Sequence, residues 1–307
     1  MVIFAVVVKP MTQKNCSSRF MEKISKFIIT TKMALEILNH GFMQRALISG
    51  ILIAIICSLI GVFLVLRRLS LLGDGLAHVA FGGIAIGLLL KIPPLISALF
   101  FTAIGSLGVQ KLINKSKVYG ESATALVLSL GVGVGVLIIG AVKGFNVDLF
   151  SYLFGSILAI SNFDLMVITI VFLLVIAFVV VFYRELILMT FNEEIARISG
   201  VKIDLINTLF AILAAMTIVI TIRAVGILLI SSLLVVPAIT AIQISKSFRN
   251  TLIISMLLSL FSVIAGIFAS FYLNLPAGGT IVVLICALFF IVLGFNNRKM
   301  QDKTLCR

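Results

Sequence analysis

Long apolar runs separated by short polar connections make up most of the chain from residue 44 onward. An α-helix needs about 20 apolar residues to cross the roughly 30 Å hydrocarbon core of a bilayer, so each such run predicts one membrane-spanning helix. The pattern therefore predicts an all-α polytopic membrane protein with about nine transmembrane helices, eight or ten being the alternatives. The predicted spans are residues 44–66, 70–90, 94–113, 122–142, 164–183, 205–222, 225–244, 251–272 and 279–295.

One apolar stretch, residues 145–161, does not fit this pattern. It is interrupted by the polar residues Asn146 and Asp148 and by Gly155 and Ser156, so it is too short and too polar for a complete span. We expect a short, partly re-entrant or interfacial helix there.

The two ends of the chain also differ from the rest. The opening run MVIFAVVV stops at Lys9 and Pro10, too early to cross a membrane. Met33 is a more natural start, so we expect residues 1–32 to come from an upstream start codon or to form a disordered N-terminal extension without function. The transmembrane domain then covers residues 33–297, and residues 298–307 form a tail.

Composition agrees with a membrane location. Hydrophobic residues make up 62% of the chain and charged residues 11%, with a mean hydropathy of +1.29, which excludes a soluble domain. A net charge of +13 suggests nucleic-acid binding in a soluble protein, but here Lys and Arg lie in short loops between apolar runs, so we expect no nucleic-acid partner. The four cysteines have no CxxC spacing and predict neither a disulfide framework nor a zinc motif.

The basic residues predict the orientation, because cytoplasmic loops are enriched in Lys and Arg. One side of the membrane receives fourteen of them: Arg67, Arg68, Lys111, Lys115, Lys117, Arg184, Arg197, Lys202, Lys246, Arg249, Arg298, Lys299, Lys303 and Arg307. From residue 33 onward the other side receives four: Arg45, Lys91, Lys143 and Arg223. We therefore expect the N-terminus outside and the C-terminal tail, residues 298–307, in the cytoplasm.

The candidate chemistry lies in the second predicted span, SLLGDGLAHVAFGG from Ser70 to Gly83. Asp74 and His78 are four residues apart and so share one face of a helix. An ionisable residue inside a membrane span is costly and indicates a functional site, although the two side chains could also simply satisfy each other or cap a broken helix.

Imidazole and carboxylate together suit Zn(II), Mn(II) or Fe(II), and the absence of a nearby thiolate argues against Cu(I). Two ligands are too few for a structural zinc site, which has four. Water or a second copy would complete the site, with His78 as neutral imidazole. Such a weak, open site fits an ion in transit better than storage.

Glycines are frequent in the spans, as at Gly82 and Gly83 and in the GVGVG run from Gly131 to Gly135. This run lies inside an apolar segment without the strand–turn–helix context of a dinucleotide site, so close helix packing is the better interpretation. The sequence contains no GxxxxGK[ST] motif, so it has no P-loop for nucleotide hydrolysis.

The longest hydrophilic connection is residues 184–204, which includes FNEEIARISGVKID. Asn192 is a suitable N-cap, Glu193 and Glu194 favour the positive end of a helix dipole, and Gly200 is a suitable terminator. We expect a short amphipathic surface helix that serves as a docking element, the alternative being an ordinary solvated connector.

Five motifs in order resemble the membrane permease subunit of zinc, manganese and iron ATP-binding-cassette importers, over residues 33–295. They are SLLGDGLAHVAFGG (70–83), DLFSYLFGSILAIS (148–161), EEIARISGV (193–201), VGILLISSLLVVPAITA (225–241) and LPAGGTIVVL (275–284).

The resemblance implies a homodimeric permease in the prokaryotic cytoplasmic membrane. Cytoplasmic ATPase subunits would supply the energy, an extracytoplasmic metal-binding protein would deliver the ion, and the chain would be neither an enzyme nor the holder of a permanent cofactor. It implies that Asp74 and His78 contact the passing metal and that Pro237, Gly82 and Gly83 belong to the pathway or its packing. It also implies that the loop with Glu193, Glu194, Ala196, Arg197 and Gly200 couples the permease to the ATPase.

Three other functions remain possible from the residues alone. An ion-coupled secondary metal transporter would need further charged groups inside the spans, which are almost absent. An intramembrane metalloprotease would need an HExxH motif or a third ligand, and the chain has two histidines, His40 and His78. A structural assembly factor would not need Asp74 in the membrane. The residues do not choose between zinc, manganese and iron, since their ligand preferences overlap.

Overall fold

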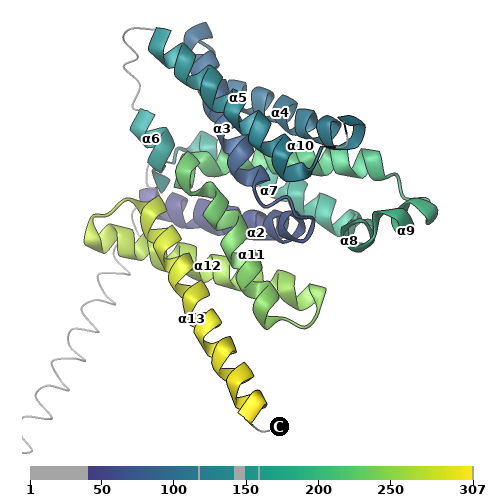
Figure 1. Cartoon of the computed structure of the whole chain (residues 1–307). Coiled ribbons are helices and arrows are strands. Elements are labelled where there is room, and N and C mark those ends of the chain that lie inside the picture. The colour runs from purple at the N-terminus through teal and green to yellow at the C-terminus, as the bar shows by residue number, and fades with distance from the viewer. Residues whose placement is uncertain (1–40, 117, 142–148, 158–159, 306–307) are drawn as a thin grey trace, which may run out of the picture. The chain divides into compact units, whose positions relative to one another are not determined.

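The computed structural model describes residues 41–116, 118–141, 149–157 and 160–305, and in these residues it is helical without strands (Figure 1). The chain divides into two units, Met1–Gln44 and Arg45–Arg307. Of the first unit only residues 41–44 are described, as the start of a helix. The prediction for residues 1–32 therefore lies outside the described residues, and the following description concerns the second unit.

The order of the elements follows the predicted order of spans. The helices are α2 (Gly41–Leu66), α3 (Leu72–Leu90), α4 (Pro94–Ser116), α5 (Gly120–Ala141), α6 (Leu149–Phe154), α7 (Asn162–Val181), α8 (Tyr183–Phe191), α9 (Glu193–Ile198), α10 (Ile203–Val225), the 3₁₀ turn η2 (Ile227–Leu229), α11 (Ile230–Ile244), α12 (Phe248–Leu273) and α13 (Ala277–Leu305).

Nine described helices are long and apolar enough to cross a membrane, which confirms the predicted all-α class and number of spans. The last helix differs from expectation in its length. α13 continues from its apolar part, Ala277–Phe295, to Leu305, so most of the predicted tail is helical. Its cytoplasmic location stays a prediction.

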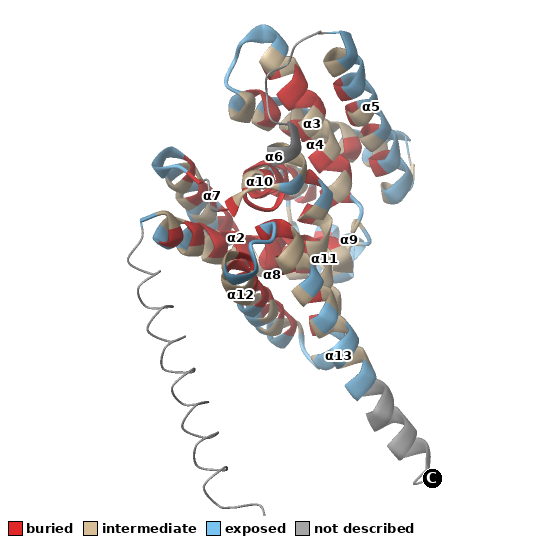
Figure 2. Cartoon of the chain, turned by 90° about the vertical axis from the view of Figure 1, so that its left-hand side faces the viewer, coloured by how far each residue is buried: buried red, intermediate tan, exposed pale blue. Residues whose placement is uncertain are grey.

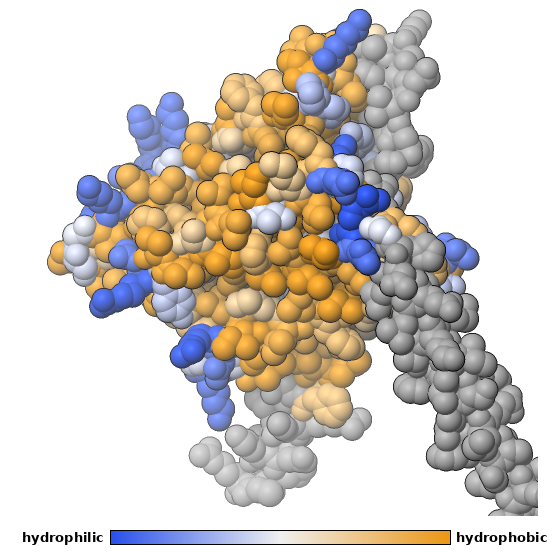
Figure 3. Space-filling view, turned by 180° about the vertical axis from the view of Figure 1, so that it is seen from behind, coloured by the Kyte–Doolittle hydropathy of each residue, from blue (hydrophilic) through white to orange (hydrophobic). Residues whose placement is uncertain are grey.

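Burial separates inner from outer helices. α2, α3 and α10 are buried over most of their apolar windows, whereas α4, α5 and α13 are buried over less than a third of theirs (Figure 2). The exposed positions are themselves apolar, such as Leu137, Phe100 and Phe290, and Figure 3 shows a broad hydrophobic face with hydrophilic residues toward its margins. Soluble proteins rarely expose so much contiguous apolar surface, whereas lipid-facing helices do.

The short helix α6 lies in the stretch for which a short helix was predicted, although residues 145–148 and 158–159 of that stretch are outside the described part. Just after α6, Gly155 crosses the break between α10 and η2 at Gly226, and both glycines have positive φ, +69° and +95°. The Ser156 N–H donates to the Arg223 carbonyl at 3.1 Å. Only glycine fits this crossing, because a Cβ on either residue would meet the other segment's backbone. A re-entrant or interfacial position for α6 stays a prediction.

Candidate functional site

Asp74 and His78 lie in the first two turns of α3, one turn apart on the same side of the helix. The distance from Asp74 Oδ1 to His78 Nε2 is 3.8 Å, too long for a hydrogen bond. An ion bound to both atoms at about 2.0–2.2 Å needs donor atoms no more than about 4.4 Å apart, so the observed spacing fits a shared metal. The two side chains are 35% and 22% exposed, so the pair is open on one side.

This pair is an incomplete ligand set. In the described part of the chain no group of three or more His, Cys, Asp or Glu side chains could hold a metal ion. A protomer thus offers one carboxylate and one imidazole, and further ligands must come from water or from another molecule. Such a site has exchangeable positions, which suits an ion that must leave again.

Glycines hold α3 close to both neighbours. A Cβ on Gly82 would lie 2.8 Å from the Gly131 carbonyl oxygen of α5, and one on Gly83 would lie 3.1 Å from the Ala98 Cα of α4. Gly75 contacts α5 in the same way, through Thr124. α3 is therefore wedged between two helices by backbone contact, which fixes the position of Asp74 and His78.

Gly82→Ala is expected to lower the free energy of unfolding by about 1–3 kcal/mol, because its methyl group would push α3 away from the α5 backbone. Gly133→Ala is the matched control, since a Cβ at that glycine of α5 meets nothing within 4 Å. Thermal unfolding of both variants in detergent measures the difference. Equal melting temperatures would contradict this packing role.

The predicted surface helix is present as α9. Asn192 caps it by accepting a hydrogen bond from the Ile195 N–H at 3.0 Å. α9 ends at Ile198, and Gly200, the predicted terminator, follows two residues later with a φ of +81°. Ala196 is fully buried, whereas Ile198 is 87% exposed. α9 is thus anchored through one side and presents a large apolar residue on the other, together with the exposed residues Glu193, Glu194 and Arg197.

Next to α9 lies a largely buried arginine whose contacts the sequence pattern did not predict, Arg67, which directly follows α2. Its Nη1 donates to Asn207 Oδ1 of α10 at 2.8 Å, and its Nε donates to Thr190 Oγ1 of α8 at 3.3 Å. The guanidinium also lies 5.0 Å from the centre of the Phe210 ring, within the range of a cation–π contact. Arg67 therefore ties the corner between α2 and α3 to two helices that flank α9.

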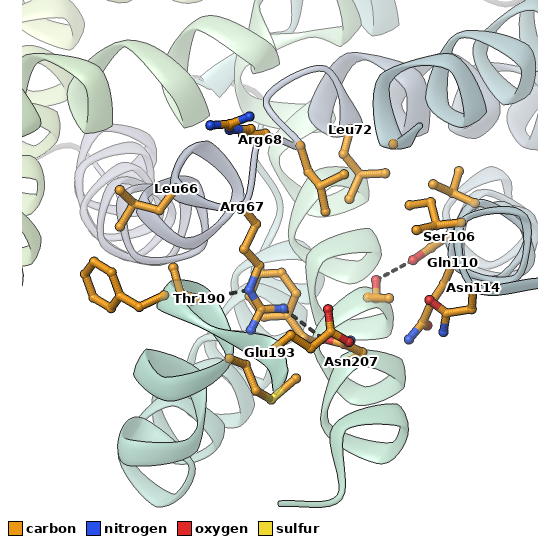
Figure 4. Close-up of a pocket in the computed structure, with 18 residues that line it drawn as sticks. Leu66, Arg67, Arg68, Leu72, Ser106, Gln110, Asn114, Thr190, Glu193 and Asn207 are labelled. Carbon is orange, nitrogen blue, oxygen red and sulfur yellow. Dashed lines mark hydrogen bonds between the residues drawn. The ribbon is translucent and has the colours of Figure 1, made fainter. Parts of the chain in front are cut away.

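Arg67 borders a cavity of about 460 Å³, into which Gln110 and Asn114 of α4 also point (Figure 4). Burial lowers the pKa of the Arg67 guanidinium to about 10, and the charge of Glu193, the first residue of α9, opposes this shift. Arg67 thus stays charged at neutral pH, and the nearby carboxylate of α9 compensates part of the desolvation cost. One feature of the sequence pointed to Arg67, the pair Arg67–Arg68 between two predicted spans. This pair was used only to predict the orientation of the chain in the membrane.

A second charged pair was also missed. Asp164, in the first turn of α7, is buried and pairs with Arg223, in the last turn of α10. Ser161 and Asp164 form a capping box, with the Ser161 hydroxyl donating to the carboxylate at 2.7 Å. The S-x-x-D spacing was the available signal, and it predicts the cap but not the distant arginine.

Pro237 is the remaining residue predicted to belong to the pathway. It is buried inside α11, where it and Thr240 border a narrow gap with Leu258 of α12 and Ile285 of α13. A proline inside a helix removes one backbone hydrogen bond, so α11 is weakened at this turn. The role of Pro237 in the pathway stays a prediction.

The chain is similar to known membrane transport proteins over most of its length. The model of a family described as "ABC 3 transport family" matches residues 39–296. The manganese transport system membrane protein MntC of Halalkalibacterium halodurans is 30% identical over 264 residues, covering 86% of this chain and 90% of that protein. The high-affinity zinc uptake system membrane protein ZnuB of Haemophilus influenzae is 31% identical, covering 83% and 97%.

The fold also matches a solved structure. PsaBC from Streptococcus pneumoniae in complex with Fab superposes with a TM-score of 0.76 at 26% sequence identity, covering 86% of this chain and 95% of that one. The family match over residues 39–296 includes the nine spans found in the described part of the chain.

Proposed function

The chain belongs to the ABC 3 transport family, and we propose that it is the permease of an ATP-driven importer whose cargo is zinc, manganese or iron. Members of this family are transport components of ATP-binding-cassette systems, and the chain is therefore a multi-pass membrane transport subunit rather than an enzyme. The identity of the ion, the homodimer and the particular partner subunits belong to the proposal.

One observation carries the choice of cargo. Asp74 and His78 place a carboxylate oxygen and an imidazole nitrogen 3.8 Å apart, partly exposed, on a helix that is otherwise apolar. Nitrogen and oxygen ligands together suit divalent first-row transition metals. Two relatives, MntC of a manganese transport system and ZnuB of a zinc uptake system, belong to systems whose metals accept nitrogen and oxygen ligands of this kind.

The incomplete ligand set supports a homodimer. Two side chains exposed toward lipid would leave a carboxylate and an imidazole without water or partner, which is unfavourable in hydrocarbon. A second copy placed against this side of α3 would add two more ligands, and an aqueous path between the copies would supply the rest.

ATP hydrolysis by the partner subunit would act on the chain through α9. In the proposed orientation α9 faces the cytoplasm, with Ile198 and Arg197 exposed for contact with an ATPase subunit. Movement of α9 would reach α3 through Arg67, so that nucleotide-driven closure alternately exposes the metal site to the two sides of the membrane.

Reconstitution tests this function. The chain, its ATPase and its extracytoplasmic binding protein are placed in liposomes, and uptake of labelled zinc and manganese is followed with and without ATP. ATP-dependent uptake is the expected result. Uptake that follows an ion gradient and ignores ATP would replace this proposal with a secondary transporter.

Arg197→Glu is expected to weaken ATPase binding at least about tenfold, because it reverses a charge on the exposed side of the docking helix. Lys202→Glu, an equal charge reversal just outside α9, is the matched control and should bind normally. Pull-down of the ATPase with detergent-solubilised variants gives the affinities. Unchanged binding of Arg197→Glu would remove α9 from the contact.

A further inference from the structure

An apolar groove runs along the outer side of α3, between α4 and α5. Its volume is about 650 Å³, within the range of about 300–1,000 Å³ typical of small-molecule sites. Val79 and Gly83 of α3 form its floor, and Ile104 of α4 and Leu130 of α5 form its walls. Gly108 leaves one wall open, because a Cβ there would meet no atom within 4 Å.

The groove and the metal residues lie on different sides of α3. Successive residues of an α-helix are about 100° apart, so the α3 residues that line the groove point on average about 130° away from Asp74 and about 90° away from His78. These lining residues are Val79, Gly82, Gly83 and Ile86. Neither metal residue borders the groove, which is therefore a separate site next to the metal pair.

One end of the groove is basic. Lys111 and Lys115, one turn apart on α4, border it there, and both are exposed. Neither has a salt-bridge partner among the described residues. From Phe101, at the other end, to Lys115 the groove follows fourteen residues of α4, about 21 Å. This exceeds the depth of one leaflet, which is about 15 Å.

The groove is long and apolar, and it has two lysine side chains at the end that would lie at the membrane surface. These features are complementary to the acyl chain and the negatively charged phosphate of an anionic phospholipid. We propose that the groove binds one acyl chain of such a lipid, with the lipid phosphate between Lys111 and Lys115. The proposal rests on the membrane location and on the predicted cytoplasmic side of the two lysines, where anionic lipids are attracted by basic residues, and does not depend on the transport role.

A helix from a second copy fits the groove less well. It would cover Lys111 and Lys115 and remove two unpaired charges from water, which costs more than leaving them beside phosphates. A lipid keeps both ammonium groups at the surface and fills the apolar part with methylene groups. Because the acyl chain would lie against α3, the lipid would also support the helix that holds the metal residues.

The absence of tryptophan in the chain allows a direct test. Leu130→Trp places a single fluorophore in the groove, and Leu137→Trp places one two turns further along α5, at an exposed position that does not border it. The full chain is reconstituted in phosphatidylcholine vesicles that contain increasing fractions of dibrominated phosphatidylglycerol, or dibrominated phosphatidylcholine as the neutral probe. Bromine quenches tryptophan only at short range, so quenching reports which lipid occupies the groove.

In the Leu130→Trp variant we expect the groove to bind phosphatidylglycerol at least about fivefold more tightly than phosphatidylcholine. This factor corresponds to the attraction between one lysine and an anionic membrane surface. Leu137→Trp should show no preference. Adding Lys111→Gln and Lys115→Gln should abolish the preference at Leu130→Trp, and Gly108→Leu, which fills the groove, should reduce quenching there. Gly133→Leu is its control, at a glycine equally free of neighbours.

Three outcomes would overturn the proposal. Equal quenching by both lipids at Leu130→Trp would show a groove without preference for the anionic headgroup. A preference that survives both lysine substitutions would place the phosphate elsewhere. Protection of Leu130→Trp from both brominated lipids would show that protein, such as a second copy, covers the groove. None of these measurements requires metal or ATP, so failure here is distinguishable from failure of the transport function.

Discussion

ATP-dependent metal uptake is expected to fall at least about 100-fold when Asp74 is replaced by alanine, and similarly for His78→Ala. Substitutions of residues that only orient a metal ligand cost 10–100-fold, and loss of one of two direct ligands costs more. The remaining ligand, with its partner gone, would hold an ion too weakly to favour its entry into the membrane. Uptake of labelled zinc and manganese into liposomes measures the effect.

Glu121→Ala is the matched control for Asp74→Ala. Glu121 is also an acidic residue in the first turn of a spanning helix, α5, and it is exposed. Its replacement should leave uptake near the wild-type rate. The amount of each variant in the membrane and its binding of the ATPase separate a loss of ligand from a loss of folding. Uptake that stays within threefold of wild type in both site variants would place the metal path elsewhere.

Arg67→Met is expected to separate ATP hydrolysis from transport, with about a tenfold fall in metal moved per ATP hydrolysed. Methionine retains the apolar contact with Phe210 but makes neither hydrogen bond, so α8 and α10 lose their connection to the corner that begins α3. Substitutions along a coupling path change coupling by about 0.5–2 kcal/mol. Leaving the partly buried Asn207 oxygen without its donor should also cost about 1 kcal/mol of stability.

Arg68→Met tests whether the lost charge alone explains this effect. Arg68 is the neighbouring residue and is exposed, so it carries the same charge without the same contacts. Its ratio of transport to hydrolysis should remain that of the wild type. If Arg67→Met also keeps the normal ratio, movement of α9 reaches α3 by another route.

Local patterns predicted the helices well, because membrane spans depend on hydropathy over about 20 consecutive residues. Span 94–113 corresponds to α4 and span 251–272 to α12, with ends that differ by at most three residues. The capping of α9 by Asn192 was predictable for the same reason, since the cap and its amide are three residues apart.

Contacts between distant segments could not be predicted in this way. Arg67 meets Asn207 across 140 positions, and Arg223 meets Asp164 across 59. The positions of these arginines relative to the spans predict on which side of the membrane each one lies. They do not predict which distant side chain each arginine binds. The same limit applies to the groove, because Gly108 and Leu130 become neighbours only when α4 and α5 pack on α3.

The crossing of Gly155 and Gly226 sets an order for biogenesis. Gly226 is made 71 positions after Gly155, which at about 5–20 residues per second takes about 4–14 s. During that interval the Ser156 N–H has no Arg223 carbonyl to bind, and an unpaired amide is unfavourable in hydrocarbon. We therefore expect α6 to stay in contact with water until α10 has been inserted, so that a helix made later is needed before the earlier one reaches its final position.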